Sequence, residues 1–359
     1  MAAPITACIL TRNEAQRLPS CIGSLRAVVA EVVVLDTGST DGTQQLAASL
    51  GASVYAFEWV DDFSAARNAA AAYARQPFIF MVDADEQLVP GSLDPLTSYC
   101  LSATSAGRVQ RENLISDTES VRELLTRVYP NAPGWRWAGR VHEQLTRDGG
   151  PPPVVQTGAT LVHSGYSKEL IASGEKVERN LRLLQVERQD RPDDAYVLYQ
   201  IGRTHFTAGN WALAVTALQS AADRLRTDSA AYLPSLLRTL AYAAMNAGDL
   251  RLAFSVLETA TDLFPDYTDL YFAYGTALLA SGDGSHLHEV RQIFEDCVSL
   301  GEPDPARYET VAGVGSYRAH HNLGAYYEAT GQLDPARDAY RAAADAGYAP
   351  AQARLTALM

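Results

Sequence analysis

One stretch, residues 78–86 (FIFMVDADE), constrains the fold of this 359-residue sequence more than any other. Its first five residues are all apolar and follow Pro77, a pattern that predicts a strand buried on both faces of a parallel sheet. In such sheets, ligands collect beyond the carboxyl ends of the strands. Asp83 and Asp85 lie at that end, and two carboxylates at this spacing suit a divalent cation that also binds a diphosphate. An isolated Asp-x-Asp can equally be a solvated turn, so its context has to decide.

The composition narrows the possible functions. A chain of this length with 47% hydrophobic residues can form two domains with separate cores. Its net charge of −13 and pI near 5.0 argue against nucleic acid or an anionic membrane surface as a partner. The first apolar segment is interrupted after Leu10, too early for a secretory signal, and no apolar run approaches the ~20 residues of a membrane span. Four scattered cysteines fit a reducing compartment, so we expect a soluble cytoplasmic protein.

The first 90 residues alternate between strand and helix signals. Cap-forming residues and the spacing of apolar residues predict three helices. One begins near Pro19, the next ends at Gly51, and the third covers residues 65–74. Because right-handed crossovers place successive strands side by side, this order implies a parallel sheet. The predicted strands cover residues 5–10, 32–35, 53–57 and 78–82.

Polar side chains follow three of these strands, so we expect them to converge on one edge of the sheet. The turn Thr11–Glu14 follows the first strand, Asp36 follows the second, and the acidic pair described above follows the fourth. The first turn has no G-x-G-x-x-G and the chain has no P-loop, which argues against a nicotinamide or flavin cofactor. The pattern favours a nucleotide-diphosphate site in which a metal ion neutralises the phosphates.

Four ordered motifs carry a family resemblance: ILTRNE at 9–14, VLDTGSTDGT at 34–43, DFSAARN at 62–68 and VDADE at 82–86. They resemble the motif set of family 2 glycosyltransferases, which have the GT-A fold. The resemblance implies that Thr11, Glu14 and Asp36 hold the nucleoside, and that Arg67 faces the base or the diphosphate. It also implies that Asp83 and Asp85 form a metal-binding DxD motif for Mn²⁺ or Mg²⁺, with a nucleotide-diphosphate sugar, expected to be a UDP-sugar, as the donor.

After residue 93 the pattern changes. Residues 99–107 are polar and small and predict a loop, LLTRVY at 124–129 predicts a strand, and residues 160–166 predict a strand that ends in a histidine, His163. Enzymes of the GT-A fold often supply a late histidine to the DxD-bound ion, so His163 is a candidate third metal ligand. A structural role for this histidine is the alternative.

The segment WRWAGRVHE at 135–143 supplies the candidates for acid–base chemistry. An inverting sugar transfer needs a base within hydrogen-bond reach of the acceptor nucleophile, and Glu143 is the candidate. A structural salt bridge from Glu143 to Arg140 or Arg127 is the alternative. His142 would orient Glu143 or touch the donor, and the two tryptophans would either stack on a sugar or fill a core.

Beyond residue 166 the sequence predicts a linker helix and then helix pairs. The joints between paired helices recur at 208–210, 247–249, 281–283 and 330–332, with insertions near 283–288 and 301–315. This spacing resembles tetratricopeptide repeats. We therefore expect a GT-A domain at 1–166, a linker helix at 167–190 and an all-α solenoid at 191–359. The whole arrangement resembles the glycosyltransferases that modify cysteine or serine in bacteriocin peptides.

Three functions follow from these features. The favoured one is a metal-dependent inverting glycosyltransferase that acts on a peptide or protein, whose repeats bind the acceptor or form a homodimer. The second is a tetratricopeptide scaffold with an inactive nucleotide-binding domain. The third is a transferase for a lipid or surface glycan, against which the lack of a basic amphipathic helix or a membrane span counts.

Overall fold

The computed structural model describes residues 2–116, 119–163, 174–225 and 230–358. They form two compact units, each with its own core. Unit 1 contains residues 1–115 and 122–187, and unit 2 contains residues 116–121 and 188–359. The four ranges above hold no helix long and apolar enough to cross a membrane.

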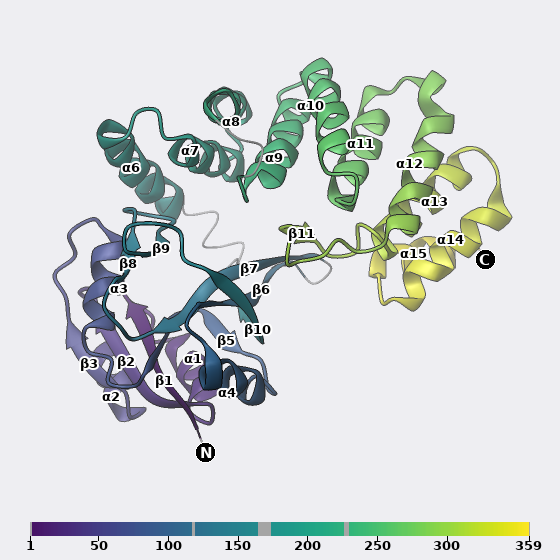
Figure 1. Cartoon of the computed structure of the whole chain (residues 1–359). Helices are drawn as coiled ribbons and strands as arrows, with labels where there is room; N and C mark the ends of the chain where they lie inside the picture. The colour runs from purple at the N-terminus through teal and green to yellow at the C-terminus, as the bar shows by residue number, and fades with distance from the viewer. Residues whose placement is uncertain (1, 117–118, 164–173, 226–229, 359) are drawn as a thin grey trace. The chain divides into compact units, whose positions relative to one another are not determined.

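Unit 1 is built on a mixed sheet with the strand order β3-β2-β1-β4-β7-β6-β10-β5 (Figure 1). The predicted parallel half is confirmed, since β1 pairs in parallel with both β2 and β4, and β2 with β3. These strands are β1 (Ala3–Thr11), β2 (Val29–Asp36), β3 (Ser53–Ala56) and β4 (Phe78–Asp83). In this register Thr11 is the partner of Asp36, and Leu10 is the partner of Asp83. The polar strand ends therefore lie together at one edge of the sheet.

The central strands are apolar throughout because helices or further strands cover both faces of the sheet. Alternate residues of β4 enter different cores: Phe80 and Val82 pack on one face, and Ile79 and Met81 on the other. The first face is covered by α1 (Leu18–Leu25), α2 (Thr43–Ser49) and α4 (Leu93–Ser102). The second face is covered by α3 (Phe63–Ala71) and by the hairpin of β8 (Trp135–Ala138) and β9 (Gln144–Arg147).

The other half of the sheet differs from the sequence prediction. Residues 99–107, expected to be a loop, belong in part to α4 and in part to β6 (Ala106–Ser116). Tyr99 packs in the core and is 7% exposed, and its hydroxyl donates to the carbonyl of Ser105 at 2.6 Å. This one aromatic ring therefore attaches the otherwise polar segment 99–107 to the core. The remaining strands are β5 (Glu86–Leu88), β7 (Glu119–Pro130) and β10 (Val154–His163).

Unit 2 consists of stacked helix pairs, which confirms the predicted solenoid (Figure 1). Each predicted joint falls between two helices of a pair. The insertion near 301–315 contains the short strand β11 (Thr310–Val311), which pairs with β7 through the amide of Ala312 and the carbonyl of Ser120. The helices are α7 (Ala195–Thr207), α8 (Trp211–Arg224), α9 (Leu233–Asn246), α10 (Leu250–Leu263), α11 (Thr268–Ser281), α12 (Leu287–Leu300), α13 (Tyr317–Ala329), α14 (Leu333–Asp345) and α15 (Ala349–Ala357), with a 3-10 turn at Gly284–His286.

The predicted linker helix falls partly outside the described residues. Its described part is α6 (Glu175–Asp190), which buries Leu183 and Leu184. The unit boundary lies within this helix, because Glu187 belongs to unit 1 and Arg188 to unit 2. Glu187 accepts a hydrogen bond from the amide of Arg140 at 3.1 Å, which ties the first part of α6 to unit 1.

Close packing of α7 on α8 depends on Gly202. A Cβ at this position would lie 2.5 Å from Cγ of Leu218, which is fully buried. We expect Gly202→Ala to destabilise unit 2 by roughly 1–3 kcal/mol, because overpacking outweighs the better helix propensity of alanine. Gly23→Ala in α1 is the matched control, since a Cβ there meets nothing within 4 Å and should be neutral or stabilising. Thermal unfolding of both variants checks this, and a Gly202→Ala protein as stable as the Gly23→Ala protein would contradict it.

Candidate functional site

Asp36 and Thr11 meet at the ends of their strands, as the sequence predicts. The Thr11 hydroxyl donates to Asp36 Oδ2 at 3.1 Å, and Asp36 is almost fully buried. Asp36 also accepts from both the amide and the hydroxyl of Ser39, and from the side chain of Gln44 at 2.6 Å. Burial alone would raise the pKa of Asp36, but the hydrogen bonds from Ser39 and Gln44 bring it below its ordinary value. Asp36 therefore shapes the loop after β2, and a nucleoside would have to share its oxygens with these donors.

Glu14 lies in the turn after β1. Its carboxylate pairs with Arg17 at 3.1 Å, and its amide donates to the hydroxyl of Thr43 at 2.9 Å. Burial raises the pKa of the Glu14 carboxyl, while the neighbouring Arg17 opposes the rise. The preceding Asn13 adopts a left-handed backbone conformation with φ of 56°, and its side chain accepts from the amide of Thr40. Hydrogen bonds thus connect the turn after β1 to the loop after β2.

Arg67 joins two of the predicted functional residues. Its Nε donates to Glu143, and its Nη2 donates to Asp83 Oδ1 at 2.9 Å. Its guanidinium also lies over the ring of Trp137, 5.1 Å from the ring centre. Glu143 is thus in an ion pair, as the alternative interpretation of the sequence held, but its partner is Arg67 and not Arg140 or Arg127. The side chains of Arg67 and Glu143 are only 7% and 8% exposed, so the pair lies in a largely dry environment.

The third nitrogen of the Arg67 guanidinium makes no hydrogen bond to the described residues. Nη1 is buried and has no hydrogen-bond partner within the described ranges. A buried donor without a partner costs free energy, and a buried guanidinium stays charged. A phosphate oxygen of a ligand is the kind of acceptor that this nitrogen lacks.

Asp83 is held by two arginines. Besides Arg67, Arg127 Nη2 donates to Asp83 Oδ2 at 2.8 Å. Burial alone would raise the pKa of Asp83, but the charges of Arg127 and Arg67 hold it well below its usual range. The same nitrogen of Arg127 also lies 3.2 Å from Oε1 of Glu86, which is fully buried and accepts from the Asp83 amide. Both oxygens of Asp83 thus face guanidinium groups.

Asp85 and His163, by contrast, are in direct contact. His163 Nε2 lies 3.0 Å from Asp85 Oδ2, and its Nδ1 lies 2.9 Å from Asn113 Oδ1. The Asn113 amide is oriented by its other end, where Nδ2 donates to Glu123 at 2.8 Å. Burial alone would raise the pKa of Asp85, but the hydrogen bond with His163 lowers it below its ordinary value.

This geometry gives His163 an acceptor on each side. A carboxylate oxygen and an imidazole nitrogen are ligands that Mn²⁺ accepts. Within the described ranges, however, no group of three or more His, Cys, Asp or Glu residues is arranged to hold a metal ion, and Asp83 does not join this pair. Two protein ligands therefore fit a metal, and the third predicted one is paired with arginines.

The side chains from Glu143 and Arg67 to His163 and Asp85 belong to one connected network, which we call the acid–arginine network. From Glu143 it runs through Arg67, Asp83, Arg127 and Glu86, and continues through Arg111, Glu123, Asn113 and His163 to Asp85. It contains five carboxylates and three guanidinium groups. The excess of negative charge would be reduced by a bound cation, which agrees with the fit of Asp85 and His163 to a metal.

Part of this network lies outside the motifs of the sequence. Arg111, Asn113 and Glu123 received no role, and Arg127 was considered only as a partner of Glu143. Within β6, Arg111 and Asn113 are two residues apart, and within β7, Glu123 and Arg127 are four apart, so each pair shares a face of its strand. This alternation of polar residues is the sequence signal that could have placed these side chains on one face of the sheet.

The other residues singled out from sequence lie around this network. His142 is exposed and has a left-handed backbone with φ of 54°, so its ring does not share the buried position of Glu143. Trp137 is 6% exposed and its indole N–H donates to the hydroxyl of Tyr129 at 3.1 Å, which confirms the core role. Trp135 also packs against the core.

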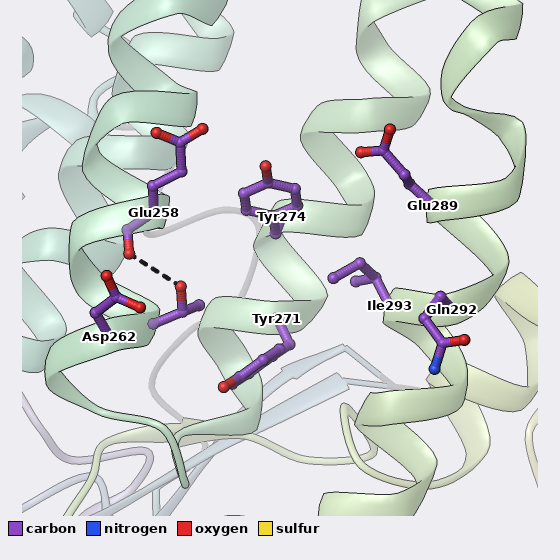
Figure 2. Close-up of a pocket in the computed structure, with 8 residues that line it drawn as sticks. Glu258, Asp262, Tyr271, Tyr274, Glu289, Gln292 and Ile293 are labelled. Carbon is purple, nitrogen blue, oxygen red and sulfur yellow. Dashed lines mark hydrogen bonds between the residues drawn. The ribbon is translucent and has the colours of Figure 1, made fainter.

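Unit 2 contains a separate cavity of about 410 Å³ among α10, α11 and α12 (Figure 2). In Figure 2, Tyr274 of α11 lies between Glu258 of α10 and Glu289 of α12. The remaining lining residues are Thr261, Asp262, Tyr271, Gln292 and Ile293. None of the residues predicted for sugar transfer lines this cavity.

Comparisons with known proteins agree with the two units. Residues 6–125 match the family model Glycosyl transferase family 2, and residues 196–224 match Tetratricopeptide repeat. A TPR repeat-containing protein of Synechococcus elongatus is 30% identical over 72% of this chain and 66% of its own length. The SPbeta prophage-derived glycosyltransferase SunS of Bacillus subtilis is 24% identical over 77% of this chain and 67% of its own. An uncharacterized glycosyltransferase of Rickettsia bellii is 38% identical over 23% of this chain and 28% of its own. The chain spans about two thirds of the length of the first two.

Proposed function

The chain carries a glycosyltransferase family 2 domain of the GT-A type followed by tetratricopeptide-type helix pairs, and from this we propose that it transfers a sugar from a nucleotide-diphosphate donor to a polypeptide side chain. We infer further that the reaction depends on a divalent metal ion and inverts the anomeric centre. The observation that carries the proposal is the acid–arginine network, which gathers Glu143, Arg67, Asp83, Asp85 and His163 into one set of contacting side chains.

The proposed division of labour follows from the contacts. Asp85 and His163 would hold Mn²⁺ or Mg²⁺, which when bound would neutralise charge on the diphosphate. Arg67 would donate its unpartnered Nη1 to a phosphate oxygen. Thr11 and Asp36 end β1 and β2, and Glu14 lies in the turn after β1; a nucleoside would be held there. A UDP-sugar is the donor that we propose.

Transfer then needs one base. The acceptor hydroxyl or thiol would lose its proton to Glu143 as its oxygen or sulfur attacks the anomeric carbon, while the bond from that carbon to the diphosphate breaks. Attack from the face opposite the leaving group inverts the anomeric configuration. Asp83, held by Arg67 and Arg127, would keep Arg67 in position.

A polypeptide acceptor is supported by the repeats. Stacked helix pairs offer an extended surface, and a flexible peptide gains affinity from a surface that is already formed. A lipid or glycan acceptor would not require such a surface, and a scaffold without activity would not require the unpartnered arginine nitrogen next to two acids.

The test of this function is donor turnover by the full chain. We expect one member of a panel of nucleotide-diphosphate sugars to be hydrolysed slowly in the presence of Mn²⁺, with release of the nucleotide diphosphate measured by chromatography. EDTA should abolish this release, and added Mn²⁺ should restore it. A protein that neither binds nor hydrolyses any donor of the panel would instead be a scaffold with an inactive domain.

A further inference from the structure

The insertion between α12 and α13 is not a simple exposed loop. Four of its residues have side chains that are 5% exposed or less: Tyr308, Thr310, Ala312 and Val314. Four consecutive residues, Tyr308–Val311, contact helices that lie far away in the sequence. Sequence reasoning located this insertion but gave it no role.

Glu309 contacts two arginines and a tyrosine. Its carboxylate accepts from Arg238 Nη2 at 2.8 Å and pairs with Arg203 Nη2 at 3.2 Å. Its backbone carbonyl accepts from Arg238 Nη1 at 2.8 Å and from the hydroxyl of Tyr267. The side chain of Arg238 is 8% exposed, so its bonds to Glu309 are largely shielded from water, where charged hydrogen bonds are strong.

The neighbours of Glu309 are held by different chemistry. The ring of Tyr308 stacks on Tyr267, with centres 4.3 Å apart and planes within 9°. The hydroxyl of Thr310 donates to Asp269 Oδ2 at 2.6 Å, and the amide of Val311 donates to Asp269 Oδ1 at 2.9 Å. Each polar or aromatic group of this segment thus has a complementary partner: a ring for its aromatic ring, arginines for its carboxylate, and a carboxylate for its hydroxyl and its amide.

The groups that meet this segment are distributed over three successive helix pairs. Arg203 lies on α7, Arg238 on α9, and Asp269 on α11, and each of these is the first helix of its pair. An extended peptide bound to a solenoid likewise contacts several successive repeats. The segment therefore has the contacts of a peptide ligand, although it is part of the chain.

We propose that the first helices of the repeats form a binding site for an extended peptide that carries a glutamate, and that Tyr308–Val311 occupies this site as an internal competitor. Arg203 and Arg238 recognise the carboxylate, and Asp269 recognises the hydroxyl and the amide that follow it. The proposal goes beyond sugar transfer and does not depend on it. It also changes what the repeats can offer an acceptor, since this surface is taken until the internal segment leaves.

Competition has a measurable consequence. A segment tethered in the same chain has a high effective concentration, so a free peptide binds with an affinity reduced by the fraction of sites that are open. Weakening the internal segment without touching the site should therefore tighten the binding of a free peptide. Glu309→Gln does this, because it removes the charge that Arg203 and Arg238 bind but keeps the size of the side chain.

The experiment uses the full chain and a fluorescent peptide with the sequence of residues 305–314, PARYETVAGV. We expect the Glu309→Gln protein to bind this peptide at least tenfold more tightly than the wild type does, as measured by fluorescence anisotropy. Adding Arg203→Gln to the Glu309→Gln protein should reverse the gain. A peptide with glutamine in place of its glutamate should bind neither protein.

Two further measurements keep the test decisive. Circular dichroism shows whether Glu309→Gln is folded, and if it is not, Thr310→Ala replaces it because that change removes only the hydroxyl that contacts Asp269 and the carbonyl of Val311. Hydrogen exchange of the wild type should show faster exchange at residues 308–312 once the peptide is present in excess. If the folded variant binds the peptide no more tightly than the wild type, Tyr308–Val311 is a permanent part of the repeat core and the proposal is overturned.

Discussion

Replacing Asp85 with asparagine should reduce sugar transfer by about a thousandfold while leaving the protein folded. The change removes a charged ligand of the proposed metal, and metal-ion stabilisation of transition-state charge is worth several kcal/mol, of which each 1.4 kcal/mol corresponds to a factor of ten. Asp85 lies in the turn after β4, with a side chain 18% exposed, so no apolar core is disturbed. The rate of transfer at saturating donor and Mn²⁺, together with Mn²⁺ affinity by calorimetry, measures the effect.

Two controls accompany this variant. Asp94→Asn removes an exposed carboxylate from the first turn of α4; it should leave activity unchanged and lower stability only slightly, by about 0.3–1 kcal/mol, through the helix dipole. His163→Ala should weaken metal binding more mildly, by about 10- to 100-fold, if the histidine mainly supports Asp85. Transfer that survives both EDTA and Asp85→Asn would show that the reaction does not use a metal at this position.

Glu143→Gln should lower kcat by about 10²- to 10⁴-fold, the usual contribution of a general base. Glutamine keeps an oxygen for Arg67 but cannot take a proton at neutral pH. If Glu143 is the base, the donor affinity measured by calorimetry should change little. If Glu143 only holds Arg67, the donor affinity should fall instead, because the neutral amide would hold the Arg67 guanidinium less strongly than the carboxylate does.

The matched control for this variant is Glu31→Gln. Glu31 is also a partly buried glutamate that pairs with an arginine, Arg75, and accepts from the hydroxyl of Thr6, but it lies near the amino end of β2. This substitution should leave kcat unchanged. A Glu143→Gln protein with near-normal kcat would assign Glu143 to a structural role, and the search for the base would move to His142.

The parts of the fold that the sequence predicted are those with a local periodic signal. The four apolar runs of the parallel sheet and the recurring joints of the helix pairs depend on residues close together in the chain. The helix over residues 93–102 was missed because its apolar face is carried by few residues, Leu96 and Tyr99 among them. β6 and β10 are determined by pairing with strands that are distant in the sequence and not by local propensity.

The candidate site was predictable to a similar extent. Asp83, Asp85 and Arg67 stand in recognisable motifs, and His163 was found because it ends a strand. Arg111 and Asn113 look like ordinary residues of an exposed strand until the fold places them against Glu123 and His163. That Asp83 would be paired on both sides by arginines could not be predicted, because Arg127 is 44 residues away in the sequence.

The acid–arginine network also limits the routes by which this protein can diverge. Removing one member of a buried ion pair leaves its partner as an unpaired buried charge, which costs about 3–5 kcal/mol. This is a large share of the free energy of unfolding of a typical domain, about 5–15 kcal/mol. Replacing both members with apolar residues can be neutral. Glu86 contacts both Arg111 and Arg127, so we expect a single replacement within this group to destabilise the domain more than a joint replacement of its members does. Successful re-engineering of this site would begin with double substitutions.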